Sequence, residues 1–230
     1  AYIGKTPTPA PLTSSDIASD IINSTHIGDT AISGFDALAT APAGTDEFLI
    51  SDAGVIKRLD ASLIGGGGIL QVKSVTKTDT QLIASSSFTA ISGFTISLTP
   101  SSASNKILLF GSVSFGGGSN LYGQGKLYRQ INSGGYSVLA GAIGDADSSA
   151  TQCTIPMQLF TGNDVWKVIV SSFNFLDAPN TTNQVDYQIH CRANGGESIR
   201  INEEDNTSDG DYDARPITSI TALEVDSGVL

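Results

Sequence analysis

Hydrophobic and polar positions alternate along the chain from Ile69 onward, in segments of strand length that are rich in β-branched and aromatic residues. Gly, Asn, Ser and Pro separate these segments, as expected for turns between strands. The segments are residues 69–77, 86–91, 94–100, 106–115, 125–131, 136–143, 153–160, 166–176, 185–193, 198–204 and 217–225. Many short strands with dense turn signals predict an all-β sandwich or barrel.

The alternation has the period of two that places successive side chains on opposite faces of a strand. In residues 106–115 one face carries Ile107, Leu109, Gly111, Val113 and Phe115. In residues 185–193 the apolar face carries Val185, Tyr187, Ile189 and Cys191, and the opposite face carries Asp186, Gln188, His190 and Arg192. We expect the apolar faces to form a core. The spacing predicts a jelly roll of roughly eight to ten strands, with a simple immunoglobulin-like sandwich as the alternative.

Four consecutive glycines, residues 65–68, divide the chain into two parts of different pattern. Because glycine favours neither helix nor strand, this run predicts a joint between an N-terminal segment, residues 1–64, and a β domain, residues 69–230. Within the N-terminal segment, apolar runs at 48–50 and 55–59 flank a Ser-Asp-Ala-Gly turn signal. These runs predict a small hairpin.

The start of the chain predicts extended structure. Residues 1–11 alternate three prolines with Thr and Ala, which favours an extended arm. After the arm, isoleucines recur every five residues, at Ile17, Ile22, Ile27 and Ile32. This spacing matches neither the helical nor the strand period, so one chain alone cannot bury the stripe well. We expect neighbouring chains to hold it.

Composition excludes several classes of protein. Charged residues make up 15% of the chain and glycine contributes 25 residues, which argues against a helical bundle. A formal net charge of −11 with 12 Lys and Arg argues against a nucleic-acid partner, because phosphate binding needs a cationic surface. No apolar run approaches the roughly 18 residues that span a bilayer, and no basic region followed by an apolar one opens the chain. We expect neither membrane insertion nor export.

No catalytic motif stands in the sequence. G-x-S-x-G, P-loop and H-E-x-x-H patterns are absent, and neither His26 nor His190 has a second histidine at ligand spacing. Glu203 and Glu204 are neighbours that point to opposite sides of an extended chain, which argues against a glycosidase pair. We therefore expect no enzymatic activity.

An acidic run at residues 203–213 is the candidate metal site. Carboxylates are ligands that Ca²⁺ prefers, and the candidate ligands are Asp205, Asp209, Asp211 and Asp213. The run lacks the distal Glu of a calcium loop, since the twelfth position from Asp205 is Pro216. Two interpretations stay open: a solvated acidic loop, and a bound Ca²⁺ or sugar contact. No other cofactor is expected.

The two cysteines, Cys153 and Cys191, lie in strand-like segments and are too few for a disulfide scaffold. Two reduced thiols packed in the sheet and a single bridge between them are both compatible with the sequence.

Tyrosines in turn-like surroundings are the candidate receptor contacts, because a ring can stack on the apolar side of a sugar while nearby polar groups bind its hydroxyls. The candidates are Tyr122, Tyr136 and Tyr212. Tyr128 also stands beside a charged residue, but we expect Tyr128 and Trp166 to pack in the core or between subunits.

Several segments together resemble a known family. They are YIGKTPTPAPLTSSDIASDII, GTDEFLISDAGVIKRLD, ILQVKSVTKTDTQ, FTAISGFTISLTPSSASNKILLFGSV, LYRQINSGGYSVL, FLDAPNTTNQVDYQIHCRANGGESIRIN and RPITSITALEV. These segments cover most of the chain. They resemble tail-fibre and other virion structural proteins of tailed bacteriophages, marine ones in particular.

The resemblance implies a trimeric jelly-roll head of the tumour-necrosis-factor or C1q type, carried on an extended N-terminal virion-attachment segment. The isoleucine stripe would then wind the three chains together. The expected function is that of a short tail fibre, made in the host cytoplasm, that binds other virion proteins by its N-terminus. Its head would bind host surface polysaccharide or protein. The alternative is a capsid decoration or head-fibre protein that only attaches to the particle and stabilises it.

Overall fold

The computed structural model describes residues 42–53, 55–64, 68–159, 164–194, 196–206, 208 and 210–229. The chain divides into two compact units, Ala1–Ile64 and Gly65–Leu230, and each is described by itself. The predicted arm and the stripe of Ile17, Ile22, Ile27 and Ile32 lie outside the described residues.

The described part of the first unit is a β-hairpin. β1 (Glu47–Asp52) and β2 (Val55–Asp60) pair antiparallel, and Ala53 in the turn between them has a φ of 51°. A 3-10 helix, η1 (Ala61–Leu63), follows and is capped by Asp60, whose Oδ1 accepts the N–H of Ser62 at 2.9 Å. The strands therefore lie at the two apolar runs named from the sequence.

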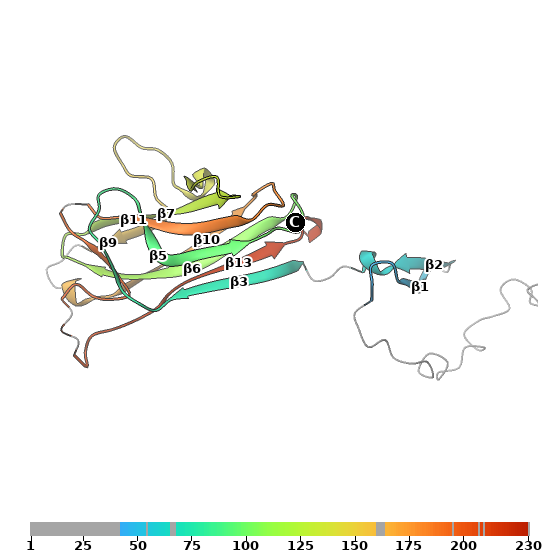
Figure 1. The fold of residues 1–230 in the computed structure, drawn as a ribbon, viewed down its shortest axis with the longest axis horizontal. Coiled ribbons are helices and arrows are strands. Elements are labelled where there is room, and N and C mark those ends of the chain that lie inside the picture. The colour runs from blue at the N-terminus through green and yellow to red at the C-terminus, as the bar shows by residue number, and fades with distance from the viewer. Residues whose placement is uncertain are drawn as a thin grey trace, which may run out of the picture. The chain divides into compact units, whose positions relative to one another are not determined.

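The second unit is a sandwich of two antiparallel sheets (Figure 1). Its strands are β3 (Ile69–Lys77), β4 (Gln81–Ile83), β5 (Thr89–Leu98), β6 (Lys106–Gly117), β7 (Tyr122–Ile131), β8 (Ser137–Val138), β9 (Ile155–Gln158), β10 (Ile169–Asp177), β11 (Val185–Arg192), β12 (Ile199–Ile201) and β13 (Thr218–Val225). Short 3-10 helices lie between or after them: η2 (Ala140–Ala142), η3 (Asp164–Trp166) and η4 (Ser227–Val229).

The strand order is that of a jelly roll. β8 and β9 both pair with β7, β12 and β13 both pair with β6, and β3 and β4 pair with β13 and β12. β3 with β4, β8 with β9, and β12 with β13 can each be taken as one interrupted strand. The sandwich then has eight strands, numbered in chain order as β3/β4, β5, β6, β7, β8/β9, β10, β11 and β12/β13. One sheet then has the order 1-8-3-6 and the other 2-7-4-5. Two Greek keys of this kind define a jelly roll, so the predicted fold class is confirmed and the immunoglobulin-like alternative is excluded.

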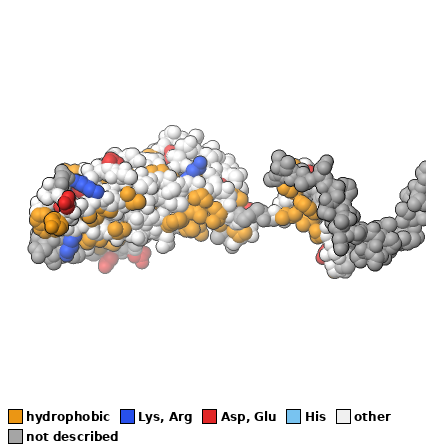
Figure 2. All heavy atoms as spheres, turned by 90° about the horizontal axis from the view of Figure 1, so that it is seen from below, with side chains coloured by type: hydrophobic (Ala, Val, Ile, Leu, Met, Phe, Trp, Pro, Cys, Tyr) orange, Lys and Arg blue, Asp and Glu red, His pale blue; other side chains and the backbone are white. Residues whose placement is uncertain are grey.

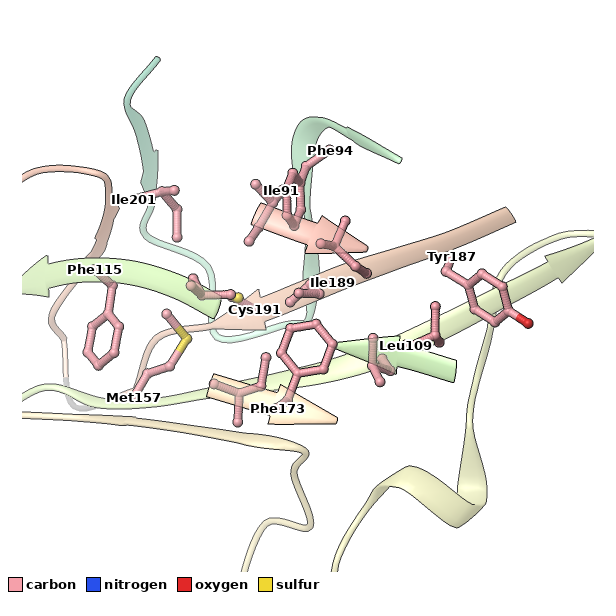
Figure 3. Close-up of a cluster of buried hydrophobic side chains, with 14 of the residues drawn as sticks. Ile91, Phe94, Leu109, Phe115, Met157, Phe173, Tyr187, Ile189, Cys191 and Ile201 are labelled. Carbon is pink, nitrogen blue, oxygen red and sulfur yellow. The ribbon is translucent and has the colours of Figure 1, made fainter. Parts of the chain in front are cut away.

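The core lies between the two sheets and is built by the predicted alternation. Ile107, Leu109, Val113 and Phe115 of β6 are buried, as are Val185, Tyr187, Ile189 and Cys191 of β11. Figure 3 shows side chains of both sheets meeting there, with Phe94 and Ile91 of β5 near Ile189.

Two segments differ from the sequence-based expectation. Residues 86–91 and 94–100 were expected as separate strands, but β5 runs through both because Gly93 adopts a φ of +67° inside it. The β5–β11 register shifts at this point, between Gln188 and His190, which is a bulge that a glycine accommodates. Residues 136–143 form only the two-residue β8 and then η2.

Buried polar groups tie the sheets together. Arg129 Nη1 of β7 donates to both carboxylate oxygens of Asp177, each at 2.9 Å, and Asp177 Oδ2 also accepts the Tyr187 hydroxyl at 2.7 Å. Because Asp177 ends β10 in the opposite sheet, this ion pair and hydrogen bond link the two layers. Burial, followed by the nearby Asp177 charge, raises the pKa of Tyr187, so its hydroxyl stays protonated and donates.

Candidate functional site

The outer face of the β3–β13–β6–β10 sheet carries no charged side chain in three successive cross-strand rows, and we call these rows the uncharged face. Strand register sets the rows, with one residue from each strand in every row. They are Val72, Leu223, Leu108 and Leu176; Ser74, Thr221, Phe110 and Asn174; and Thr76, Ser219, Ser112 and Ser172. In a chain of net charge −11, a sheet face without charge is a feature that needs a physical reason.

One row of the uncharged face is apolar on all four strands. Val72 is 58% exposed and Leu176 is 45% exposed at its two ends, and Phe110 in the next row is 42% exposed. The other rows carry mainly hydroxyl groups, such as the Ser74 and Thr221 pair at 3.1 Å. Contiguous exposed apolar surface with a polar surround marks interaction sites.

A hollow lies beside Phe110 on this face. It is an open depression of about 410 Å³ lined by Phe110, Gly111, Ser112, Ser172, Phe173, Asn174 and Ser219. The hollow exists because its lining residues from three adjacent strands are mostly small. The uncharged face therefore presents a partly exposed aromatic ring at the edge of a shallow depression.

Hydrophobic side chains of the second unit also gather in patches on the face seen in Figure 2. Several large apolar side chains of the second unit are exposed besides those already named, including Ile69, Leu70, Trp166 and Val170. This surface composition favours contact with another protein surface over full solvation.

The structure places two of the three candidate receptor tyrosines at the β5–β11–β7–β8 sheet and the third in a loop of the other sheet. Tyr122 opens β7 and is 45% exposed, and Tyr136 precedes β8 and is half-buried. The Tyr136 ring lies 5.9 Å from that of His190 on β11. Tyr212 is fully exposed in the loop between β12 and β13.

The acidic run forms a loop in which its carboxylates bind to the protein's own groups. Asp205 Oδ1 accepts from Arg200 Nε at 2.8 Å. Asp213 Oδ2 accepts the N–H groups of Gly210 and Ser208 at 3.0 and 2.7 Å, and these bonds lower the pKa of Asp213. Asp211 is exposed, and Asp209 lies outside the described residues. Among the described residues no group of three or more His, Cys, Asp or Glu side chains is placed to hold a metal ion, and the calcium interpretation stays a prediction.

The neighbouring Glu203 and Glu204 are both buried, with different surroundings. Glu203 pairs with Arg215 at 2.5 Å and with Arg200 at 3.3 Å. Glu204 is 4% exposed, and its Oε1 has no hydrogen-bond partner within the described part of the chain. Burial, and then a hydrogen bond with Asp213, raise the pKa of Glu204. The two carboxylates thus fix the acidic loop to the domain.

Both cysteines are free thiols. Cys191 is fully buried, and burial raises its pKa to about 12. Burial also raises the pKa of Cys153. Of the two interpretations left open by the sequence, the structure contains the reduced pair, and both thiols are protonated at neutral pH.

The described helices are all short 3-10 turns, and none of them is long and apolar enough to cross a membrane.

Comparison with known proteins returns structural matches only. No protein-family model matches the chain, and no curated protein matches it either. A crystal structure of the infectious bursal disease virus VP2 subviral particle aligns with 76% of this chain and 41% of that chain, at 13% identity and a TM-score of 0.37. A structure of the Gt strain of that virus aligns with 77% of this chain and 42% of that chain, at 16% identity and a TM-score of 0.33.

The Eiger TNF structure from S. frugiperda aligns with 64% of this chain and 92% of that chain, at 8% identity and a TM-score of 0.31. This chain spans less than half the length of the two viral chains. The jelly-roll assignment rests on the strand pairing of this chain itself.

Sequence reasoning missed the uncharged face. Its rows join residues as distant as Val72 and Leu223, and only the register of four strands brings them side by side. The signal present in the sequence was the outward half of each alternating strand, where Ser, Thr and Leu stand in place of the charged residues found on most exposed strand faces.

Proposed function

We propose that the chain is a non-enzymatic structural protein of a tailed-bacteriophage virion, namely a short homotrimeric tail fibre. Residues 1–64 attach it to other virion proteins, and its jelly-roll unit binds the host cell surface.

The uncharged face is the observation that carries this proposal. We assign a second copy of this chain as its occupant, because the face offers both a partly exposed Phe110 ring and a hollow beside it. Copies of a protein with net charge −11 repel one another, so a contact between copies is favoured where neither surface carries charge. In a heterologous contact, Phe110 of one copy enters the hollow of the next copy, and such contacts can close into a three-fold assembly.

The sequence resemblance supports the same proposal from a separate direction. It implies a trimeric jelly-roll head on an attachment segment, and the strand order of the second unit is that of a jelly roll. Its isoleucine stripe supplies a second set of residues that neighbouring chains would bury.

Trimerisation gives weak receptor contacts a functional strength. Three heads on one fibre, and several fibres on one particle, bind with a high effective concentration once the first contact forms. Individually weak saccharide or protein contacts then suffice for attachment to the host.

Immunogold electron microscopy of intact phage particles, with antibody against residues 65–230, tests the proposal together with binding of the purified full chain to host cells. Label at the tail with saturable cell binding supports a receptor-binding fibre. Label over the capsid without cell binding supports the alternative of a capsid decoration protein. Particles without label contradict a virion role altogether.

A further inference from the structure

The outer face of the other sheet, β5–β11–β7–β8, differs from the uncharged face because it carries aromatic rings, two cations and the carboxylate of Asp186, which lies close enough to Tyr136 for its charge to act on that residue. Tyr128 of β7 and His190 of β11 stack with ring centroids 3.9 Å apart and planes at 15°. Tyr136 adds a third ring, tilted by 50° against His190. Gln188 holds this group in place, since its Oε1 lies 2.9 Å from His190 Nε2 and its Nε2 donates to Thr95 Oγ1 at 2.8 Å.

Two cations lie next to the stacked rings. Lys126 is directly opposite His190 in the β7–β11 register, and its Nζ lies 4.6 Å from the centre of the Phe88 ring. The guanidinium carbon of Arg192 lies 5.5 Å from the same ring, and Arg192 donates to Gln124 at 2.8 Å and to Thr151 at 2.6 Å. We call Phe88, Lys126, Tyr128, Tyr136, His190 and Arg192 the aromatic–cationic face.

The two cations of this face differ from several other basic residues of the second unit. Within the described residues, neither Lys126 nor Arg192 forms an ion pair, whereas Lys77, Arg129, Arg200 and Arg215 each pair with a carboxylate. All six side chains of the face are partly exposed. Two cations without an ion pair in the described part of the chain, beside three clustered rings, favour an anion at the Arg192 end of this face, since Asp186 lies six positions away along β11.

We propose that the aromatic–cationic face binds an acidic saccharide, one that carries carboxylate groups on its sugar rings. This inference rests on the proposed function and names the ligand class of the host-binding surface. The ring faces would contact the apolar C–H side of a sugar, and Lys126 and Arg192 would bind its carboxylates. A uronic-acid polymer offers these two features, a C–H face and a carboxylate, at each of its residues.

The polar neighbours fit a sugar as well. Gln188 and Thr151, both partly exposed, place amide and hydroxyl groups beside the rings and cations, and such groups bind sugar hydroxyls. This face is the outer surface of a β-sheet, and such a surface suits an extended polymer that lies along it.

The test measures binding of the full chain to an oligogalacturonate, with the same oligomer after reduction of its carboxylates to alcohols as the neutral ligand. We expect the acidic oligomer alone to bind, with an affinity that falls as salt rises. Lys126→Gln should raise its Kd about tenfold or more, because one charge-assisted contact is lost. The matched control Lys73→Gln removes the same charge from exposed β3 and should change the Kd by less than about twofold.

Equal binding of the acidic and reduced oligomers, or no binding of either, would overturn the proposal. So would an equal effect of Lys126→Gln and Lys73→Gln at unchanged melting temperature. Host-cell binding is measured in parallel to separate this inference from the proposed function. Cell binding that survives Lys126→Gln contradicts the site but not the fibre, whereas absence of wild-type cell binding with retained saccharide binding contradicts the fibre but not the site.

Discussion

Removing the Phe110 ring should weaken assembly of the chain by an amount that follows from its exposure. Phe110 exposes 42% of its surface, and an aromatic side chain offers about 200 Å², so a contact that covers the ring buries about 85 Å². At about 25 cal/mol per Å² this burial contributes about 2 kcal/mol per protomer, or about 6 kcal/mol per trimer. The concentration of half-dissociation scales with the square root of a trimer's dissociation constant. Phe110→Ala should therefore raise that concentration about a hundredfold.

Sedimentation equilibrium of the full chain measures this quantity. The free energy of association that Phe110 contributes adds to the free energy that residues 1–64 contribute. The ratio of the half-dissociation concentrations of variant and wild type therefore does not depend on residues 1–64. Tyr122→Ala is the matched control, because Tyr122 is an aromatic side chain of similar exposure, 45%, on the other sheet. We expect it to shift the half-dissociation concentration by less than about threefold. Equal shifts in the two variants, or none in either, would refute the role of the uncharged face in assembly.

Three further predictions concern the jelly-roll unit. In Gly111→Ala the new Cβ would lie 2.2 Å from the backbone carbonyl oxygen of Ser219 in β13, so the free energy of unfolding measured in urea should fall by about 3 kcal/mol or more. Gly144→Ala is the control, because the space beside Gly144 is open, and it should change the free energy of unfolding by less than about 1 kcal/mol. Tyr187→Phe removes the hydrogen bond to the buried Asp177 carboxylate, and the free energy of unfolding in urea should fall by about 2 kcal/mol. An unchanged urea midpoint would contradict the stabilising link between the two sheets. Burial raises the pKa of Glu204 above its ordinary value of 4.5, so the folded state favours the neutral carboxyl group. The resulting stabilisation is fully present below pH 4.5 and is lost as the pH rises through the pKa of the folded state. Glu204→Gln, which stays neutral and can still donate to Asp213, should be more stable than wild type at pH 7 and equal to it at pH 4, and the opposite order at pH 7 would contradict this account.

The sequence predicts the core well because a strand's side-chain period is local. The buried positions of β6 and β11 follow from the alternation of apolar and polar residues within each segment. Which side chains are buried therefore does not depend on which strands become neighbours. Gly93 shows where local reasoning stops, since a glycine read as a break between strands instead forms a bulge within one.

The two surfaces that carry the proposals depend on pairing between distant segments. Tyr128 and His190 stack only because β7 and β11 pair in one register, although the two residues lie 62 positions apart in the sequence. Phe110 faces outward, a position that alternation predicts, but its hydroxyl-bearing neighbours and the hollow come from β10 and β13. Such surfaces are set by topology, which composition and periodicity do not specify.

The measurement that tests the central claim most directly is electron cryomicroscopy of the purified full chain. The account predicts particles with three-fold symmetry in which the β3–β13–β6–β10 sheets face the axis, with Phe110 covered by a neighbouring copy and Tyr128 on the outside. A monomer in the images, or an assembly in which Phe110 faces solvent and the β5–β11–β7–β8 sheets are buried, would contradict the account.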